Sequence, residues 1–564
     1  MHEFRINDFI TLRLIKGKTV IFIKGKRYLY CARVLLNISR NKFKDFNEIN
    51  SIDEAIEVYD KCIFRNQIVE GPDAIPTSKI YHSITPMDEF RAHCSNLQVW
   101  VENNYDTRIL HSNLSFPLLK TLAEEGEPLA KKVFKEEIAK RFVSGYSNVI
   151  TYLSKEDYFD YFTKEEFDIL VAELRDKGLH PIFYYKTIIG VANDNLLDLS
   201  NKNIKDSNKL IGLEKVRNLR TLILGNDNQD DNWYHNYLPT LPESIENLKN
   251  LKNLDLTDVR LEKLPKFIGN LQSLQTLIVK NNELETLPMS ITSLINLKNL
   301  DLSCNKLEYL PKAIKKIYHL QELSVGSNPL VNLPESIGNL KNLRLLNLRE
   351  VSLETLPNTI GDLVSLKSLI LTGSRIKDIP ESIGNLSMLK ELELSSNRLT
   401  SLPETIGNLK VLQALNLKSN KLLFLPKSIG NLVSLQTLDL KGNKLKTLPK
   451  SIGKLTSLYT LDLKGNELVR LPESLGKLKL LKFLDLTGNS LRELPESIGF
   501  LSSLQTLVLR GNELKTIPDS IGNLTSLKRL DLYGNMLTNL PVSINQLKGL
   551  KSIDLRLNSI EITL

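Results

Sequence analysis

The amino-acid sequence predicts an α/β solenoid, a stack of short repeated coils, preceded by a small mixed α/β module. The first observation is a run of fourteen prolines that recur every 23 residues from Pro242 to Pro541, each in a frame such as LPESIGNLKNLRLLNL. The second is that residues 1–195 show no such period. Because one 23-residue coil cannot bury its own leucines, neighbouring coils must stack and share a continuous core.

Each coil is expected to contribute one short strand. In the segment LKSLILTGSRIKDIP (366–380), apolar residues alternate with polar ones and then change to a wider spacing. Such strands would lie side by side as a parallel sheet, about 4.8 Å apart. An Asn follows most strands, and its amide can bond the backbone of its own turn and of the neighbouring coil. This ladder is interrupted at Val259, Val351 and Ser374, where we expect altered turn packing.

The sequence before the repeats contains a strand-like part followed by a helical part. The segments FITLRLI, TVIFI and RYLYCARVLL are strand-like and are separated by KGK, which predicts a small antiparallel meander. A capping box, Ser51 with Glu54, begins a helix, and helical patterns continue to about Lys177. The predicted domains are 1–70, a small β-meander plus helix; 71–195, a helical segment; 196–241, N-terminal capping and first repeats; and 242–564, the regular repeats.

The repeat pattern LxxLxLxxNxLxxLPxxIGxL, over about 196–564, resembles the intracellular leucine-rich repeats of the 23-residue class. It is similar to Ras-associated repeat scaffolds and to plant intracellular Ras-group-related proteins. The resemblance implies a leucine-rich repeat horseshoe with a parallel sheet on its concave side. It also implies a non-enzymatic scaffold whose protein partners belong to small GTPase or phosphatase signalling. The segment at 93–122 resembles the N-terminal modules of archaeal leucine-rich repeat proteins, which implies no activity.

Composition and cysteine spacing bear on the cellular setting. The formal charge of +9 permits an acidic partner without demanding nucleic acid. The four cysteines lie in no paired spacing, the N-terminus has no secretory signal, and no apolar segment reaches 18 residues. We therefore expect a cytoplasmic protein with no membrane span and no bound nucleic acid, and the oligomeric state stays open. The first 44 residues carry eleven Lys or Arg, either on solvated strand edges or on a surface for anionic partners.

No motif for enzymatic chemistry is evident. The sequence lacks the P-loop GxxxxGK[ST], the zinc-binding HExxH and the nucleophile elbow GxSxG, so we expect no cofactor, no metal ion and no catalytic residue. The alternative is a substrate-recognition subunit of an enzyme whose N-terminal module has an unrecognised activity. That activity would need a reactive thiol, and the pKa of Cys94 or Cys31 would then be lowered.

The inner face of the predicted sheet carries the main functional hypothesis. The stretch TLDLKGN occurs twice, at 437–443 and 460–466, and its Asp and Lys belong to two charged columns along successive strands. These columns can recognise a partner's charge pattern, with aromatic and Arg side chains as anchors. Alternatively, the Asp and Lys neutralise each other diagonally on a solvated face. The predicted partner-binding residues are Asp439, Asp462, Asp485, Asp531, Asp554, Lys418, Lys441, Lys464, Arg510, Arg529, Tyr533, Phe483 and Arg556.

A second, shorter candidate lies near the N-terminus. Residues 18–22, KTVIF, match the basic–x–hydrophobic–x–Phe sequence with which partners dock onto protein phosphatase 1. The possible docking residues are Lys18, Val20 and Phe22. Such a peptide must add as an extended strand with its apolar side chains free. The hypothesis therefore requires that Val20 and Phe22 do not fill the core of their own meander.

Overall fold

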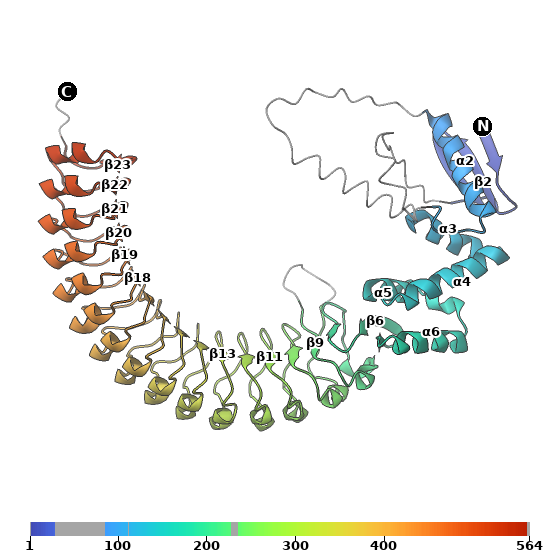
Figure 1. Ribbon diagram of the computed structural model, residues 1–564, viewed down its shortest axis with the longest axis horizontal. Helices are drawn as coiled ribbons and strands as arrows, with labels where there is room; N and C mark the ends of the chain where they lie inside the picture. Colours follow the sequence, from blue (N-terminus) through green and yellow to red (C-terminus); the bar gives the residue numbers. More distant parts are fainter. Residues whose placement is uncertain (1, 29–84, 111, 227–234, 561–564) are drawn as a thin grey trace. The chain divides into compact units, whose positions relative to one another are not determined.

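The chain forms two compact units, 1–179 and 180–564, shown in Figure 1. The computed structural model describes residues 2–28, 85–110, 112–226 and 235–560. The helix predicted to begin at Ser51 and the thiol of Cys31 lie outside the described residues.

The first unit begins with a four-stranded antiparallel meander in the order β1-β2-β3-β4. Lys16 and Gly17 join its second and third strands, with φ angles of 49° and 73°. Two positive φ angles give the turn a twist that matches the twist of the strands it joins, and glycine adopts such an angle without strain. The predicted KGK separator is therefore a hairpin turn. The strands are β1 (His2–Arg5), β2 (Ile10–Ile15), β3 (Lys18–Ile23) and β4 (Lys26–Arg27).

From residue 85 onwards, the described part of this unit is helical. α3 and α4 pack against each other, and the rings of Phe116, Phe134 and Tyr158 meet with centroids 5.1 to 5.6 Å apart. The last helix, α6, begins with a capping box between Thr163 and Glu166, which satisfies two backbone N–H groups at its start. The described helices are α2 (Pro86–Glu102), α3 (Ser112–Glu124), α4 (Pro128–Val143), α5 (Ser147–Lys155), the 3-10 turn η2 (Tyr158–Tyr161) and α6 (Lys164–Asp176).

The second unit opens with a small sheet in the order β6-β5-β8. Its side chains Ile182, Ile189 and Leu210 join the hydrophobic core of the repeats. The helical segment expected at 71–195 therefore gives way, after α6, to strands that belong with the repeats. The elements are β5 (His180–Tyr184), β6 (Thr187–Ala192), η3 (Ser207–Lys209), β8 (Leu210–Ile211) and η4 (Leu213–Lys215).

The repeats form one 16-stranded parallel sheet, which runs in chain order from β7 to β23 without β8. The central leucines of neighbouring strands lie in register, as Leu438 does with Leu415 and Leu461. The strands line the inner side of the array and the 3-10 turns its outer side (Figure 1). The predicted solenoid with a parallel sheet is therefore confirmed. The strands are β7 (Leu196–Asp198), β9 (Thr221–Ile223), β10 (Asn253–Asp255), β11 (Thr276–Ile278), β12 (Asn299–Asp301), β13 (Glu322–Ser324), β14 (Leu345–Asn347), β15 (Ser368–Ile370), β16 (Glu391–Glu393), β17 (Ala414–Asn416), β18 (Thr437–Asp439), β19 (Thr460–Asp462), β20 (Phe483–Asp485), β21 (Thr506–Val508), β22 (Arg529–Asp531) and β23 (Ser552–Asp554).

Each regular coil returns along its outer side through a 3-10 turn that starts one residue after the repeat proline. These turns run from η5 (Glu243–Asn247) to η18 (Val542–Gln546). In most of them a Gly packs against the turn of the next coil, and a Cβ built on Gly430 would lie 2.3 Å from the carbonyl oxygen of Ser451. Only glycine therefore allows the outer turns to stack at this distance.

The predicted ladder of buried Asn side chains is confirmed. The Asn443 amide nitrogen donates to the carbonyl oxygens of Leu417 and Leu440, both at 2.9 Å, and its amide oxygen accepts the Leu422 N–H at 3.0 Å. The same pattern recurs from coil to coil, so each Asn ties its own turn to the preceding coil. Because these groups are buried, the bonds satisfy backbone atoms that water cannot reach.

The interruptions of the ladder are only partly repaired. At Ser374 the shorter hydroxyl donates to the Leu348 carbonyl oxygen at 2.6 Å, while Val259 and Val351 are buried without a polar atom to offer. In the first coils, Asn236 takes the role of a ladder Asn although it lies in a longer loop. Its amide donates to the Leu199 and Leu224 carbonyl oxygens.

Candidate partner-binding face

The inner face of the sheet presents the first and third residues of most strands, although Asp531, the third residue of β22, is itself buried. In β18, Leu438 is fully buried, whereas Thr437 is exposed and Asp439 is half-buried. Side chains alternate across a strand, so the third residue and the residue two positions later lie on the same side as the first. The sheet therefore brings the two predicted charged columns together on one surface.

The Asp column first serves the backbone of its own strand end. Oδ1 of Asp439 accepts the Lys441 N–H at 2.9 Å, and Asp462 accepts the Lys464 N–H at the same distance. Asn416 makes the equivalent bond to Lys418 at 3.0 Å. Local bonds of this kind are typical of Asp and Asn at turns. Because Asn makes the bond equally well, the carboxylate charge is not required for this turn.

Three carboxylates of the column lie on adjacent strands in direct register, Asp439 beside Asp462 and Asp462 beside Asp485. Burial raises the pKa of the central Asp462, and the two flanking carboxylates raise this pKa further, while the hydrogen bond from Lys464 lowers it. Like charges directly opposite each other destabilise a sheet by about 0.2–1 kcal/mol. The fold therefore carries these charges at a small loss of stability.

The Lys column forms no close ion pair with the Asp column. Lys441 acts on Asp462 only through space, where it partly offsets the rise that burial causes in the pKa of that carboxyl. Among the described residues, no carboxylate lies within 4.0 Å of the ammonium nitrogens of Lys418, Lys441 or Lys464. The three residues lie on successive coils, since Ser419 donates to the Lys441 carbonyl oxygen at 2.7 Å and Gly442 to that of Lys464 at 2.8 Å. Direct diagonal Asp–Lys ion pairs are therefore not observed for these three lysines, while Lys441 interacts with Asp462 of the neighbouring coil through space.

The last coils hold the most organised part of the face. The guanidinium of Arg510 lies 4.0 Å from the centre of the Tyr533 ring, and that of Arg556 lies 5.6 Å from it. Arg529 pairs with Asp531 at 3.2 Å. A groove of about 520 Å³ lies beside this pair, between β22 and β23. The predicted anchors Arg510 and Tyr533 are thus in direct contact, which the 23-residue spacing alone did not specify, while Arg529 pairs with Asp531.

Two further predicted residues complete this end of the face. Arg556 pairs with Asp554 at 2.7 Å and holds the pKa of that carboxyl at about 2. Phe483 is half-buried at the start of β20, between Thr460 and Thr506 of the neighbouring strands. It lies two strands away from β22, so the structure does not join Phe483 to the Tyr533 cluster.

The possible docking segment at the N-terminus lies in β3. Its side chains Val20 and Phe22 are only 7% and 9% exposed, and the Arg13 guanidinium covers the Phe22 ring at 4.6 Å. Because both apolar side chains already belong to the core of their own sheet, they are not available to a phosphatase groove in this fold. The requirement set by the sequence argument is not met.

Other chemistry is not supported within the described residues. Burial raises the pKa of the Cys94 thiol to about 11, which is the opposite of what a reactive thiol requires. In the described ranges, no three His, Cys, Asp or Glu side chains gather as a metal site would require. No described helix is both long and apolar enough to cross a membrane.

Comparisons with known proteins agree with this architecture. The family model described as a leucine-rich repeat region matches six overlapping segments, 200–332, 312–397, 331–423, 358–441, 406–482 and 472–562. A leucine-rich repeat protein of Leptospira interrogans is 36% identical, with a TM-score of 0.56, over 64% of this chain and 95% of the other. A search of the curated proteins finds no match.

Receptor structures are also similar over the repeats. A TDR receptor is 29% identical with a TM-score of 0.50, covering 59% of this chain and 58% of the receptor. The plant peptide hormone receptor RGFR1, in complex with RGF2, is 31% identical with a TM-score of 0.48, covering 61% and 64%. The chain thus spans less than two thirds of these receptor chains. With the family model matching well over half of its residues, this chain belongs to the leucine-rich repeat family.

Proposed function

We propose that this protein is a non-enzymatic scaffold that binds a protein partner on the inner face of its repeats, between β17 and β23. The observation that carries the proposal is the set of charges on this face that the fold does not use. Lys418, Lys441 and Lys464 form no ion pair within 4.0 Å among the described residues. The adjacent Asp side chains carry a negative charge that their backbone hydrogen bonds do not need, since Asn416 makes the same bond without one.

Such charges suit recognition better than stability. Exposed ion pairs stabilise a fold by about 0–1 kcal/mol, so their absence here costs little. Across an interface, the same charges orient a partner and accelerate its encounter. The Arg510–Tyr533–Arg556 cluster adds an aromatic and Arg anchor whose side chains are already held in place, which lowers the entropy lost on binding.

The class of partner and the location are proposed from the sequence. A small GTPase or a phosphatase partner follows from the resemblance to Ras-associated scaffolds, and a cytoplasmic location from the cysteine spacing. The alternative, a substrate-recognition subunit of an enzyme, has no support in the described part of the chain, because the pKa of the Cys94 thiol is raised.

The test is affinity capture from the native cell extract with quantitative mass spectrometry. The full-length protein is compared with a variant in which Lys418, Lys441, Lys464 and Arg510 are changed to Glu. The matched control changes four exposed lysines of the outer turns and loops, Lys450, Lys454, Lys477 and Lys548, to Glu, with the same change in net charge. Circular dichroism verifies that both variants fold.

The proposal predicts proteins that the wild type and the outer-side control capture and the inner-face variant loses. If both variants lose the same proteins, net charge rather than this surface determines binding. If neither variant loses any, the inner face is a solvated part of the scaffold and the proposal is wrong.

A further inference from the structure

One flank of the repeat array carries a column of basic side chains just after the ladder position of four consecutive coils. Arg398, Lys421 and Lys444 donate backbone N–H groups to the preceding coil at 2.8 to 3.0 Å, so the rungs lie in register, with Arg375 at the same position one coil earlier. At about 4.8 Å between coils, four rungs cover roughly 14 Å. This set of Arg375, Arg398, Lys421 and Lys444 is called the basic column.

The basic column differs from the same flank in other coils because its charges are unpaired. Lys306 pairs with Glu283 at this position, and Lys377 pairs with Glu354 two residues further along the coil. All four members of the basic column are exposed, and none forms an ion pair with a described residue. The hydrogen bond from Lys377 lowers the pKa of Glu354. Arg375 and Arg398 lower this pKa further, but only through space. Among the described residues, no direct ion pair therefore has to break when another molecule binds the column.

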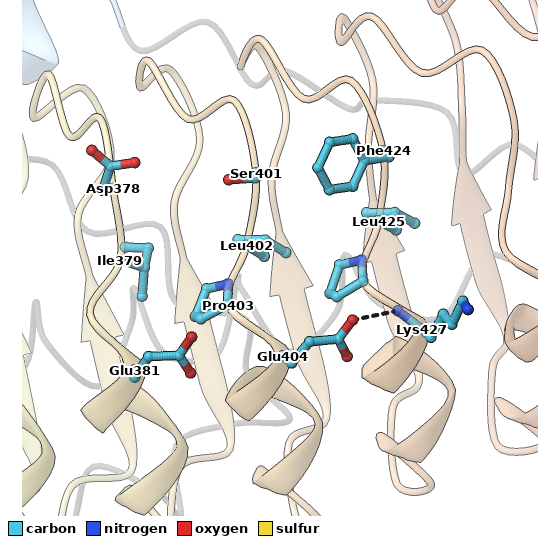
Figure 2. Close-up of a pocket in the computed structure, with 11 residues that line it drawn as sticks. Asp378, Ile379, Glu381, Ser401, Leu402, Pro403, Glu404, Phe424, Leu425 and Lys427 are labelled. Carbon is cyan, nitrogen blue, oxygen red and sulfur yellow. Dashed lines mark hydrogen bonds between the residues drawn. The ribbon is translucent and has the colours of Figure 1, made fainter.

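Beside the basic column, the flank exposes two large apolar side chains. Leu423 and Phe424 are 50% and 55% exposed. The preceding coil has Thr400 and Ser401 at these positions. Phe424 forms one wall of a groove of about 560 Å³ whose floor is made by the Leu-Pro steps of successive coils (Figure 2). This space, called the flank groove, is large enough for one or two apolar side chains.

The opposite edge of the flank groove carries two carboxylates, and Lys427 stands at the equivalent position of the next coil. Glu381 and Glu404 begin their outer turns below the Leu-Pro steps, and Asp378 lies in the same row as Ser401 and Phe424 (Figure 2). Glu404 accepts the backbone N–H groups of the next turn, and these bonds lower its pKa, so it stays ionised at neutral pH. The lining of the groove is thus apolar with three carboxylates, Asp378, Glu381 and Glu404, and one lysine, Lys427. The basic column precedes this lining along each coil.

This order of charges discriminates between classes of ligand. A nucleic acid strand is negative along its whole length and would be repelled by the three carboxylates that line the groove. An anionic membrane surface would meet the same carboxylates. A polypeptide can place acidic side chains towards the basic column and an apolar side chain on the floor, and its backbone N–H groups can face these carboxylates.

We propose that the flank groove binds an extended segment of a partner protein, acidic along one edge and carrying an aromatic or branched aliphatic side chain. The charge around the groove favours association with an acidic segment. Residues 405–482 hold fourteen Lys or Arg and four Asp or Glu, a net charge of +10, whereas the whole chain has a net charge of +9. A local field of this sign accelerates the association of an acidic segment. The flank groove and the basic column share no side chain with the inner-face site of the proposed function. This inference therefore does not depend on that proposal.

The test uses the full-length protein as bait for a displayed library of random 16-residue peptides. The enriched peptide is then synthesised with a fluorescent label, and its affinity is measured by anisotropy at low and high salt. Labelled oligo(dT) of 20 nucleotides and vesicles of phosphatidylcholine with phosphatidylserine are measured in parallel. We expect enrichment of peptides with several Asp or Glu and an aromatic or aliphatic residue, and tighter binding at low salt.

Two variants locate the binding site. Phe424→Ser removes the apolar wall, and the double change Arg398→Glu with Lys421→Glu reverses half of the basic column. Tyr309→Ser and the double change Arg260→Glu with Lys306→Glu are the matched controls. They occupy the same positions in other coils, the double change reverses the same number of charges, and Tyr309 is equally exposed. Each test variant should weaken peptide binding by about tenfold or more, as hot-spot residues do, and the controls should change it less than about twofold.

Several results would overturn the inference. They are a library that enriches no acidic and apolar peptide, enriched peptides that bind Phe424→Ser as tightly as the wild type, or binding only of the oligonucleotide or the vesicles. The inner-face variant provides a separate comparison, since peptide binding that is lost in that variant but retained in Phe424→Ser would place the peptide on the inner face instead.

Discussion

The Arg510 guanidinium lies 4.0 Å from the centre of the Tyr533 ring, although the two residues come from different coils. Arg556 approaches the same ring from the next coil at 5.6 Å. An aromatic ring between two cations is attracted to both. The ring therefore holds two guanidinium groups in position on the inner face, where an acidic or aromatic group of a partner can meet them.

If this cluster is the anchor of the inner face, Tyr533→Ala should weaken capture of the partner by about tenfold, as truncation of a hot-spot residue does. Tyr533→Phe keeps the ring and should bind within about twofold of the wild type, because the cation–π contact does not need the hydroxyl. The measurement is the dissociation constant for the captured partner. Equal binding by Tyr533→Ala would remove the cluster from the interface.

Asp462→Asn should stabilise the protein at neutral pH by up to about 1 kcal/mol, because it removes the central charge of three stacked carboxylates. Asn416 shows that an amide keeps the backbone bond to the residue two positions later. The midpoint of urea denaturation at pH 7 measures the change. Asn416→Asp is the reverse control and should destabilise, since it places a charge beside Asp439.

This gain should depend on pH in a defined direction. The pKa of Asp462 is raised in the folded state, so ionising it costs free energy of folding. The penalty is absent below the unfolded-state pKa of about 3.9, and it is complete above the raised folded-state pKa. Asp462→Asn should therefore match the wild type near pH 3 and exceed its stability at pH 7. A constant difference between the two would contradict the raised pKa.

Gly430→Ala should destabilise the array by about 1–3 kcal/mol, since the added methyl would lie 2.3 Å from the Ser451 carbonyl oxygen and force neighbouring turns apart. Ser451→Ala changes the same contact without adding volume. The buried Ser451 hydroxyl has no hydrogen-bond partner among the described residues, so this variant should be neutral or slightly stabilising. The midpoint of thermal denaturation of each variant measures the change in stability. If Gly430→Ala has the same midpoint as the wild type, neighbouring turns can separate without loss of stability.

Asn443→Ala should destabilise the protein by about 1–3 kcal/mol, because the buried Leu422 N–H loses its partner. The Leu417 and Leu440 carbonyl oxygens lose one of two donors and keep the amides of Asn420 and Asn466. The loss should appear as local opening around residues 417–443, measured by amide hydrogen exchange. Asn282→Ala tests whether the effect is general along the ladder, since this amide makes the equivalent bonds. A loss below about 1 kcal/mol would mean that the turns relax to satisfy these groups.

Local patterns were read correctly where one residue determines one conformation. The Lys–Gly pairs adopt the positive φ angles of a hairpin turn, and the prolines precede every outer turn. The ladder Asn was predicted because an Asn with a 23-residue period can only bond its own and the neighbouring coil. By contrast, the strands at 180–192 were not predicted. β5 and β6 pair with each other, β5 also pairs with Leu210 and Ile211, and the side chains Ile182 and Ile189 are buried in the core of the repeats, which the local pattern does not indicate.

The sequence by itself determined the repeat, the parallel sheet and the list of side chains on its inner face, because a strict period and the alternation of a strand leave no other arrangement. The tertiary structure alone decided how these charges are used. Each Asp turns to the N–H of its own strand end, the lysines of the inner face stay unpaired, and Tyr533 lies between two arginines. Those choices depend on distances and rotamers of side chains between coils, which a one-dimensional spacing does not contain.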